Sequence, residues 1–168
     1  MTDYIKEYEF KNPPKEITYY DDEPLKLSKE FSFFHNKTKF RKELNRLQYL
    51  FKEYLKTPLI AAGIRDSYLR EDYTEKYLIV LFATNEIVKD TNRIIEKHSG
   101  KEINSGCFFL ESTPNYLLLL TEDMDGLKSG IETMELIFKQ TFEDYFIRKN
   151  FEDFIKISSF KMIGCLNP

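Results

Sequence analysis

The sequence has few of the residues that build metal or nucleophilic sites: its 168 residues include no tryptophan, two histidines and two cysteines. His35 and His98 lie in separate segments and lack the His-Glu-x-x-His spacing of a zinc site. Two cysteines are too few for a disulfide framework. Cys107, which begins an apolar run, is expected to be a small buried hydrophobe. The sequence therefore predicts no metal site, no cofactor and no cofactor-binding residue.

An excess of positive charge and long apolar runs are also missing. The net charge is −3, with basic and acidic residues interspersed, so no nucleic-acid partner is expected. No run approaches the roughly 18 apolar residues of a membrane-spanning helix, so no membrane partner is expected either. The first ten residues lack the apolar core of a signal peptide. The chain is expected to be cytoplasmic, or secreted if a signal has been removed.

The residues that are present indicate a globular domain. Hydrophobic residues make up 42% and charged residues 32%, and the apolar content includes 15 phenylalanines and 11 tyrosines. The length fits one domain with a sizeable core. Residues 1–12 form an N-terminal lead-in, either a flexible tail or a packed segment. Residues 13–168 are predicted to form a single α/β domain.

Hydrophobic patterning predicts the elements of this domain. Continuous apolar runs predict interior strands over residues 77–82, 107–111 and 116–121, each covered on both faces. Residues 16–20 form a further strand candidate, and residues 21–24 a turn. Apolar residues at helical spacing predict helices over residues 38–56, 86–98 and 126–140. The predicted fold class is α+β, an α/β sandwich with a mixed central sheet covered by about three helices.

The rest of the chain is organised around residues 108–139. Ser112-Thr113-Pro114-Asn115 separates two apolar runs and predicts a hairpin turn. An acidic turn and an amphipathic helix follow directly. Gly126 and Gly130 are then explained by a turn and by close approach of helix to strand.

The same stretch carries a family resemblance. The order Leu117-x-Leu119, Asp123-x-x-Gly126, Gly130 and Thr133-Met134 resembles the non-catalytic N-terminal α/β domain of β-N-acetylhexosaminidases and O-GlcNAc-hydrolase-like glycoside hydrolases. That domain precedes the catalytic barrel. The helix of that family has a Thr-Leu-x-Gln-Leu pattern, and this chain departs from it at Met134 and Leu136.

The resemblance implies an accessory role. In such enzymes an extended segment like residues 155–164 leads into the first barrel strand, and this sequence closes with Pro168 at about that point. A barrel typically needs about 250 residues. The chain is therefore expected to be an accessory or scaffold domain without catalysis of its own. Whether a parent glycoside hydrolase exists stays open.

No acidic cluster is assigned as catalytic. A glycosidase uses two carboxylates about 5 to 10 Å apart across a sugar, and adjacency in the sequence does not supply that geometry. The best interpretation of the group around Asp123 is an acidic turn that caps the following helix. The other acidic clusters are at residues 21–23, 71–72 and 152–153. No catalytic residue is predicted.

The C-terminal third is rich in aromatic residues: Phe142, Tyr145, Phe146, Phe151 and Phe154. These exceed what one terminal helix needs for its own buried face. We expect them to contact a catalytic barrel or to mediate self-association through residues 142–163. The alternative is a stand-alone sugar- or protein-binding module, in which carbohydrate is a partner.

Overall fold

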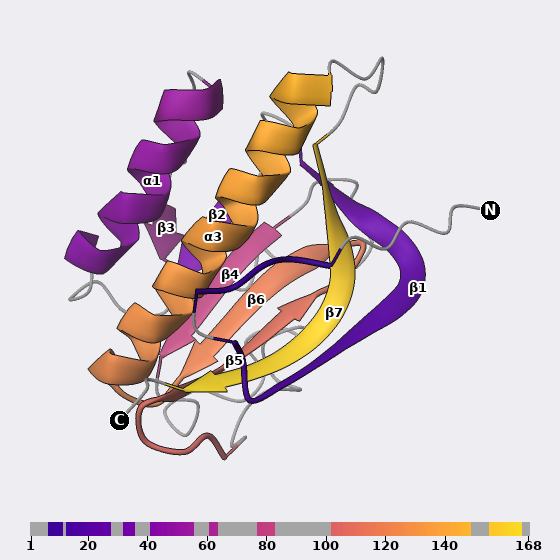
Figure 1. The fold of residues 1–168 in the computed structure, drawn as a ribbon. Helices are drawn as coiled ribbons and strands as arrows, with labels where there is room; N and C mark the ends of the chain where they lie inside the picture. The colour runs from indigo at the N-terminus through magenta and orange to yellow at the C-terminus, as the bar shows by residue number, and fades with distance from the viewer. Residues whose placement is uncertain are drawn as a thin grey trace.

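The computed structural model describes residues 7–11, 13–27, 32–35, 41–55, 61–63, 77–82, 102–148 and 155–165. Figure 1 shows a mixed sheet of seven strands with the helices α1 (Arg41–Leu55) and α3 (Met124–Arg148) in front of it. The strands are β1 (Glu16–Leu27), β2 (Ser32–His35), β3 (Ala61–Gly63), β4 (Tyr77–Phe82), β5 (Cys107–Ser112), β6 (Tyr116–Thr121) and β7 (Ile155–Cys165). The predicted α+β class is confirmed. The helix predicted over residues 86–98 lies outside the described residues.

The sheet has an antiparallel half and a parallel half. Its strand order is β1-β7-β5-β6-β4-β2-β3. β7 runs antiparallel to both β1 and β5, and β5 is antiparallel to β6. β6, β4, β2 and β3 are parallel to one another.

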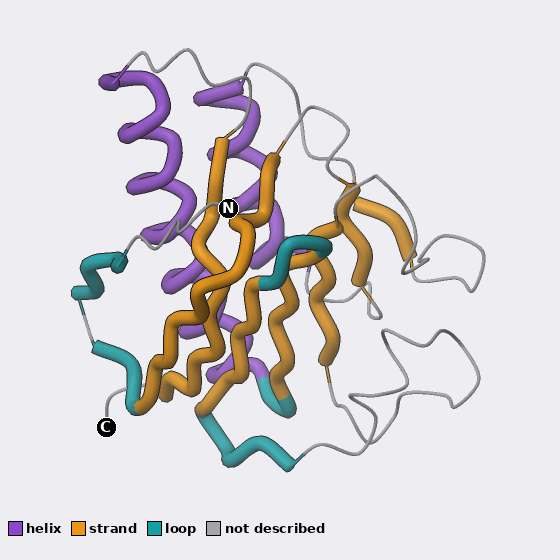
Figure 2. Tube along the Cα trace, turned by 90° about the vertical axis from the view of Figure 1, so that its right-hand side faces the viewer, coloured by secondary structure: helices purple, strands orange, loops and turns teal. Residues whose placement is uncertain are grey.

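Both described helices lie on one face of this sheet, as the view turned by 90° also shows (Figure 2). No helix among the described residues is long and apolar enough to cross a bilayer.

The predicted hairpin joins β5 to β6, and a threonine holds its turn. The Thr113 hydroxyl accepts hydrogen bonds from the N–H groups of Asn115 and Tyr116, at 3.2 and 3.1 Å. The Thr113 N–H donates to the Tyr116 carbonyl at 2.8 Å. Every residue of both strands is buried, so the prediction of interior strands is confirmed here.

The core lies between the sheet and the helices. Both helices turn a regular apolar stripe inward, because their apolar residues recur every three or four positions. Phe51 of α1 packs edge-on against two rings of α3, with centroid distances of 4.9 Å to Phe138 and 5.4 Å to Phe142. The other inward residues are Leu44, Leu47 and Leu50 on α1, and Leu127, Ile131, Met134 and Ile137 on α3.

The turn predicted at residues 21–24 is wrong. β1 continues through these residues from Glu16 to Leu27, and its pairing with β7 shifts register between Tyr20 and Leu25. Pro24 cannot donate a ladder hydrogen bond, and prolines within sheets are confined to edge strands, strand starts and bulges. The residues that predicted a turn therefore lie in an irregular part of an edge strand instead.

The prediction for Cys107 is also wrong in part. Cys107 is buried as expected, but it forms a disulfide with Cys165, 58 positions away, with an S–S distance of 2.06 Å. The reason lies in the topology: β7 returns beside β5 in a register that places these two residues opposite each other. Nothing in the local sequence around either cysteine indicates that pairing.

The N-terminal residues 7–11 pack on the helix side of the sheet. The Tyr8 side chain is buried, and its hydroxyl accepts a hydrogen bond from the Ser158 N–H of β7 at 3.0 Å. The Gln140 side chain of α3 forms two hydrogen bonds with the Glu9 backbone. Its Oε1 accepts from the Glu9 N–H at 2.8 Å, and its Nε2 donates to the Glu9 carbonyl at 2.7 Å. We call residues 7–14 the N-terminal strap, of which Asn12 is outside the described residues.

The aromatic C-terminal third is described only in part. α3 extends eight residues beyond its predicted end, and Phe142 in that extension is fully buried against α1. Phe142 therefore belongs to the core rather than to an exposed patch. The side chains of Tyr145 and Phe146, and all of Phe151 and Phe154, are outside the described residues. Self-association through residues 142–163 stays a prediction.

Candidate functional site

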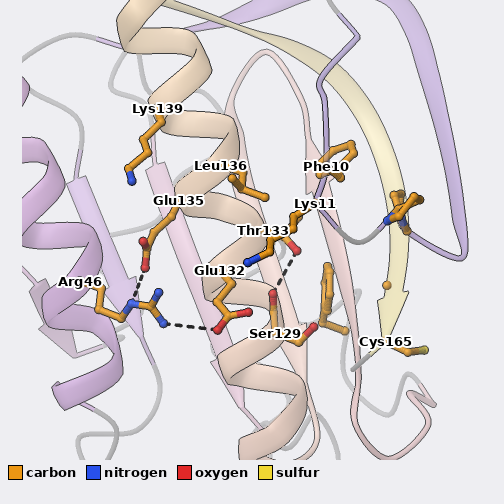
Figure 3. A pocket seen from close by; sticks show the side chains of 14 residues that line it. Phe10, Lys11, Arg46, Ser129, Glu132, Thr133, Glu135, Leu136, Lys139 and Cys165 are labelled. Carbon is orange, nitrogen blue, oxygen red and sulfur yellow. Dashed lines mark hydrogen bonds and ion pairs between the residues drawn. The ribbon is translucent and has the colours of Figure 1, made fainter. Parts of the chain in front are cut away.

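A groove on the helix side of the molecule is the candidate site. It has a volume of about 280 Å³, and the N-terminal strap, α3, α1 and the end of β7 form its walls (Figure 3). Phe108, Gly164 and Cys165 line it from the sheet side. α3 contributes the largest share of its lining, with Ser129, Glu132, Thr133, Glu135, Leu136 and Lys139. These residues lie on the outward stripe of the helix, between the buried positions.

A cluster of charged residues occupies one wall of the groove. Arg46 of α1 points across to α3, where its Nε lies 2.5 Å from Glu135 Oε1 and its Nη1 lies 3.8 Å from Glu132 Oε1 (Figure 3). The Glu135 side chain is 18% exposed, whereas those of Arg46 and Glu132 are about half exposed. The closer pair is better shielded from water, so it contributes more to holding α1 against α3.

Two lysines bring further positive charge to the same groove. Lys11 reaches into it from the strap, over α3, and Lys139 extends from α3 one turn beyond Glu135 (Figure 3). Within the described part of the chain, neither lysine side chain forms a hydrogen bond or an ion pair. The groove thus combines three cationic groups with two carboxylates, and both carboxylates face Arg46.

The strap wall is held in place by specific contacts. The two hydrogen bonds between Glu9 and Gln140 anchor the strap to α3 just before Phe10 and Lys11. The Tyr8 N–H also donates to the Tyr19 hydroxyl of β1 at 3.0 Å. The Phe10 ring is half-buried against the core. The groove is therefore bounded by ordered backbone on each side.

The acidic turn before α3 is a helix cap, as predicted. Asp123 Oδ1 accepts from the Gly126 N–H at 2.8 Å, and Oδ2 accepts from the Gly106 N–H and the Ser105 hydroxyl, also at 2.8 Å. Partial burial by itself would raise the pKa of Asp123, but these three hydrogen bonds outweigh it and lower the pKa below its usual value. This carboxylate stabilises the start of α3 and ties it to the turn before β5.

The two glycines of the family-like motif are where the helix approaches the sheet most closely. A Cβ on Gly126 would meet the Cys107 carbonyl, and one on Gly130 would lie 2.5 Å from a methyl group of Leu119. Both positions are buried. Close packing of α3 on β5 and β6 therefore explains both glycines.

A second polar cluster lies on the opposite face of the sheet. Glu111 of β5 accepts a hydrogen bond from the Tyr116 hydroxyl at 2.9 Å and pairs with Lys161 of β7 at 3.7 Å. The Lys161 amino group also lies 5.9 Å from the centre of the Tyr20 ring. Because Glu111 is compensated by both neighbours, this cluster links β6, β5, β7 and β1 rather than presenting a reactive group.

Among the described residues, the acidic clusters considered in the sequence analysis do not place two carboxylates together as a catalytic pair. Residues 21–23 are exposed on β1, and Asp123 is engaged as a helix cap. Residues 71–72 and 152–153 are outside the described residues, as is His98. No group of three potential metal ligands occurs among the described residues. The groove itself was missed, since its residues come from five separate segments of the chain. The only available signal was the polar stripe on the helix of residues 126–140.

No protein-family profile matches the sequence, and no curated protein matches it. Solved structures do match its fold. The protein CpGH84D is 12% identical with a TM-score of 0.58, and the match covers 95% of this chain and 24% of that protein. The GH20 exo-β-N-acetylglucosaminidase from Vibrio harveyi, solved with N-acetylglucosamine, is 9% identical with a TM-score of 0.57. That match covers 90% of this chain and 18% of the enzyme.

The fold of this chain is similar to that of a part of these enzymes. The β-N-acetylhexosaminidase from Bacteroides fragilis matches as well, over 90% of this chain and 23% of the enzyme, with 10% identity and a TM-score of 0.50. The hexosaminidase-like fold thus accounts for nearly the whole of this chain but for about a fifth to a quarter of each matched protein. The predicted resemblance is confirmed at the level of fold.

Proposed function

We propose that this chain is a non-catalytic accessory domain of a hexosaminidase-type glycoside hydrolase, and that it packs against a catalytic barrel and supports it. The coverage of the structural matches carries this proposal, since nearly all of this chain corresponds to a small part of each matched protein. A catalytic barrel of about 250 residues would lie outside such a part.

The chemistry of the groove supports the same assignment. Glu132 and Glu135 are the two carboxylates that line it, one turn apart on a single helix. Retaining and inverting glycosidases place their two carboxylates on either side of a scissile bond, with one of them protonated to serve as the acid. Here both carboxylates lie on the same side of the groove and face one guanidinium, an arrangement that ties α1 to α3.

The disulfide bears on where such a domain works. Disulfides persist in oxidising environments and are rare in reducing ones. The Cys107–Cys165 bond therefore favours the secreted alternative over a cytoplasmic location. A thiol titration of protein isolated from its natural source, denatured without reductant, should find no free thiol. Two free thiols per chain would contradict this assignment.

The accessory role is tested by activity measurements on the purified chain of 168 residues. It should fold but release no 4-nitrophenol from 4-nitrophenyl N-acetyl-β-D-glucosaminide. Antibodies against it should co-isolate hexosaminidase activity from the natural source, in a polypeptide or complex larger than this chain. Turnover by the purified chain that is abolished by Glu135→Gln and retained in Glu143→Gln would contradict the proposal.

A stand-alone binding module is the second candidate, and the groove is the observation that favours it. Ligand sites are typically concave and combine apolar walls with a few convergent polar groups, as this groove does. A monomeric chain that binds a sugar and co-isolates with no hydrolase would favour this candidate over the accessory role.

A further inference from the structure

We propose that the Cys107–Cys165 disulfide is a redox switch that holds the end of β7 in place. Its reduction by a dithiol frees that end and joins two cavities that the end of β7 separates. We call residues 163–165 the tip of β7. The inference rests on where the disulfide lies in the sheet, and it does not depend on the accessory role.

Two cavities meet at the tip of β7. The groove on the helix side is lined there by Gly164 and Cys165, and Cys165 lies at its edge (Figure 3). A second cavity, with a volume of about 140 Å³, is lined by Ile163 and Cys165 together with Cys107 of β5. Phe108 and Cys165 line both cavities. The tip of β7 is therefore part of the wall between them.

Strand pairing holds the tip less firmly than it holds the rest of β7. The pairing of β7 with β1 ends at Ile163, which lies opposite Glu16. In the described part of the chain, the last two residues of β7 thus have a strand neighbour on one side only. Cys107 and Cys165 are the terminal pair of that remaining ladder with β5. Strand ends open locally at low free-energy cost, so the disulfide cross-links the sheet where opening would begin.

The tip covers an apolar side chain without adding one of its own. Gly164 lies against the Phe108 ring so closely that a Cβ on Gly164 would be 2.3 Å from it. Phe108 is only 2% exposed while the tip is in place. Movement of the tip would uncover this ring, which borders both cavities. The opened state therefore has one longer cleft with an apolar floor.

The switch operates by thiol–disulfide exchange. Cys107 is 8% exposed, whereas Cys165 is more exposed at the edge of both cavities, so a thiolate of the dithiol attacks Cys165 Sγ. A bond forms between the dithiol and Cys165, and Cys107 leaves as a thiolate that takes up a proton. The second thiol of the reductant then displaces Cys165. The products are two protein thiols and the cyclic disulfide of the oxidised reductant.

The first test measures backbone order parameters of the full chain, labelled with ¹⁵N, with and without dithiothreitol. Reduction should lower the values at the tip of β7 from about 0.85 to below about 0.6, while those of residues 117–120 in β6 stay near 0.85. An unchanged tip would overturn the proposal. An equal loss of order in β6 would also overturn it, because the bond would then hold the whole domain rather than the tip.

Alkylation by iodoacetamide distinguishes opening of the tip from unfolding of the domain. In the reduced chain under native conditions, Cys165 should react at least about threefold faster than Cys107, which stays within β5. Equal rates would contradict the proposal, since both thiols are equally accessible in an unfolded chain. The variant Cys107→Ala/Cys165→Ala is the control, and its tip should be mobile with and without dithiothreitol. A variant tip as rigid as that of the oxidised wild type would also count against the switch.

The joining of the cavities has its own readout. The fluorescent probe 1-anilinonaphthalene-8-sulfonate, which binds exposed apolar surface, should bind the reduced chain at least about tenfold more tightly than the oxidised chain. Near-ultraviolet circular dichroism should be retained in the reduced chain, which separates an opened cleft from a molten globule. Equal binding of the probe to the two forms, or loss of the near-ultraviolet signal on reduction, would overturn the proposal.

Discussion

The two faces of the helix layer are built from different kinds of residue. On α3, the side chains of Leu127, Ile131, Met134 and Phe138 face the core and are completely buried. One position further along the chain from two of them, Glu132 and Lys139 are exposed and line the groove. α1 repeats this contrast, with Leu47 buried and Tyr49 69% exposed.

The inward residues stabilise the fold, whereas the outward residues are available for binding. Burying a large apolar side chain contributes about 1.5–3 kcal/mol, and the inward residues are close-packed against one another and the sheet. The outward charges are held by ion pairs that water screens, and such pairs contribute about 0–1 kcal/mol. Substitutions on the outward face should therefore change binding without changing the fold.

The sharpest contrast in stability should come from α1. Leu47→Asp places a charge at a completely buried position and should cost about 4 kcal/mol or more in free energy of unfolding. Tyr49→Asp, two residues away on the exposed face, should change it by less than about 0.5 kcal/mol. Urea unfolding followed by circular dichroism measures both. Equal effects would show that the helix is not oriented as described.

The disulfide provides stability that does not come from the helix layer. Reducing the Cys107–Cys165 bond should lower the free energy of unfolding by about 2–4 kcal/mol, since the bond closes a long loop between β5 and β7. Thermal unfolding with and without a phosphine reductant measures this effect. The variant Cys107→Ala/Cys165→Ala should not respond to the reductant. A wild type that is equally insensitive would argue against the bond.

Gly130 lies where the inward face of α3 leaves no room for a side chain. Gly130→Leu should lower the free energy of unfolding by about 1–3 kcal/mol, because the new side chain would overlap Leu119. The control Lys128→Leu is exposed on the same helix and should have an effect near zero. Removing a helix glycine normally stabilises by up to about 1 kcal/mol, so a gain in stability for Gly130→Leu would place this residue on the outward face.

The smallest effect is expected at the Asp123 cap and should depend on pH. Asp123→Asn should lower the free energy of unfolding by about 0.5–2 kcal/mol at neutral pH. Because the pKa of Asp123 is lower in the folded state, its contribution is complete above the unfolded-state value of 3.8. That contribution is lost as the pH falls through the lower folded-state pKa. Urea titrations from pH 7 to pH 2.5 should show the two proteins converging below about pH 4. A constant difference over the whole range would show that ionisation of Asp123 does not matter.

The elements that were predicted correctly are those whose structure follows from residues close together in the sequence. The run from Tyr116 to Leu120 indicated an interior strand, and the helical spacing of apolar residues within 38–56 indicated a helix with one buried face. Both are confirmed, by β6 and by α1. Asp123 and Gly130 were also interpretable, because a cap and a close approach depend on neighbours near in the sequence.

The features that were missed depend on residues distant in the chain. The Cys107–Cys165 bond requires β7 to pair with β5, and pairing partners follow from topology rather than from local pattern. The groove joins the strap to Arg46 of α1 and to the outward stripe of α3. Each of these segments alone resembles an ordinary solvated surface. The bulge in β1 was missed because the residues that favour turns also occur in irregular edge strands.

An alanine scan along α3 from residue 127 to residue 142, with the free energy of unfolding measured for each variant, tests the contrast between the two faces most directly. Losses of about 2–5 kcal/mol should recur at the inward positions Leu127, Ile131, Met134, Ile137 and Phe138. Losses should stay below about 0.5 kcal/mol at Lys128, Glu132 and Lys139. A loss at Lys139 as large as that at its neighbour Phe138 would contradict the account, since the outward face would then be part of the core and could not serve as a binding surface.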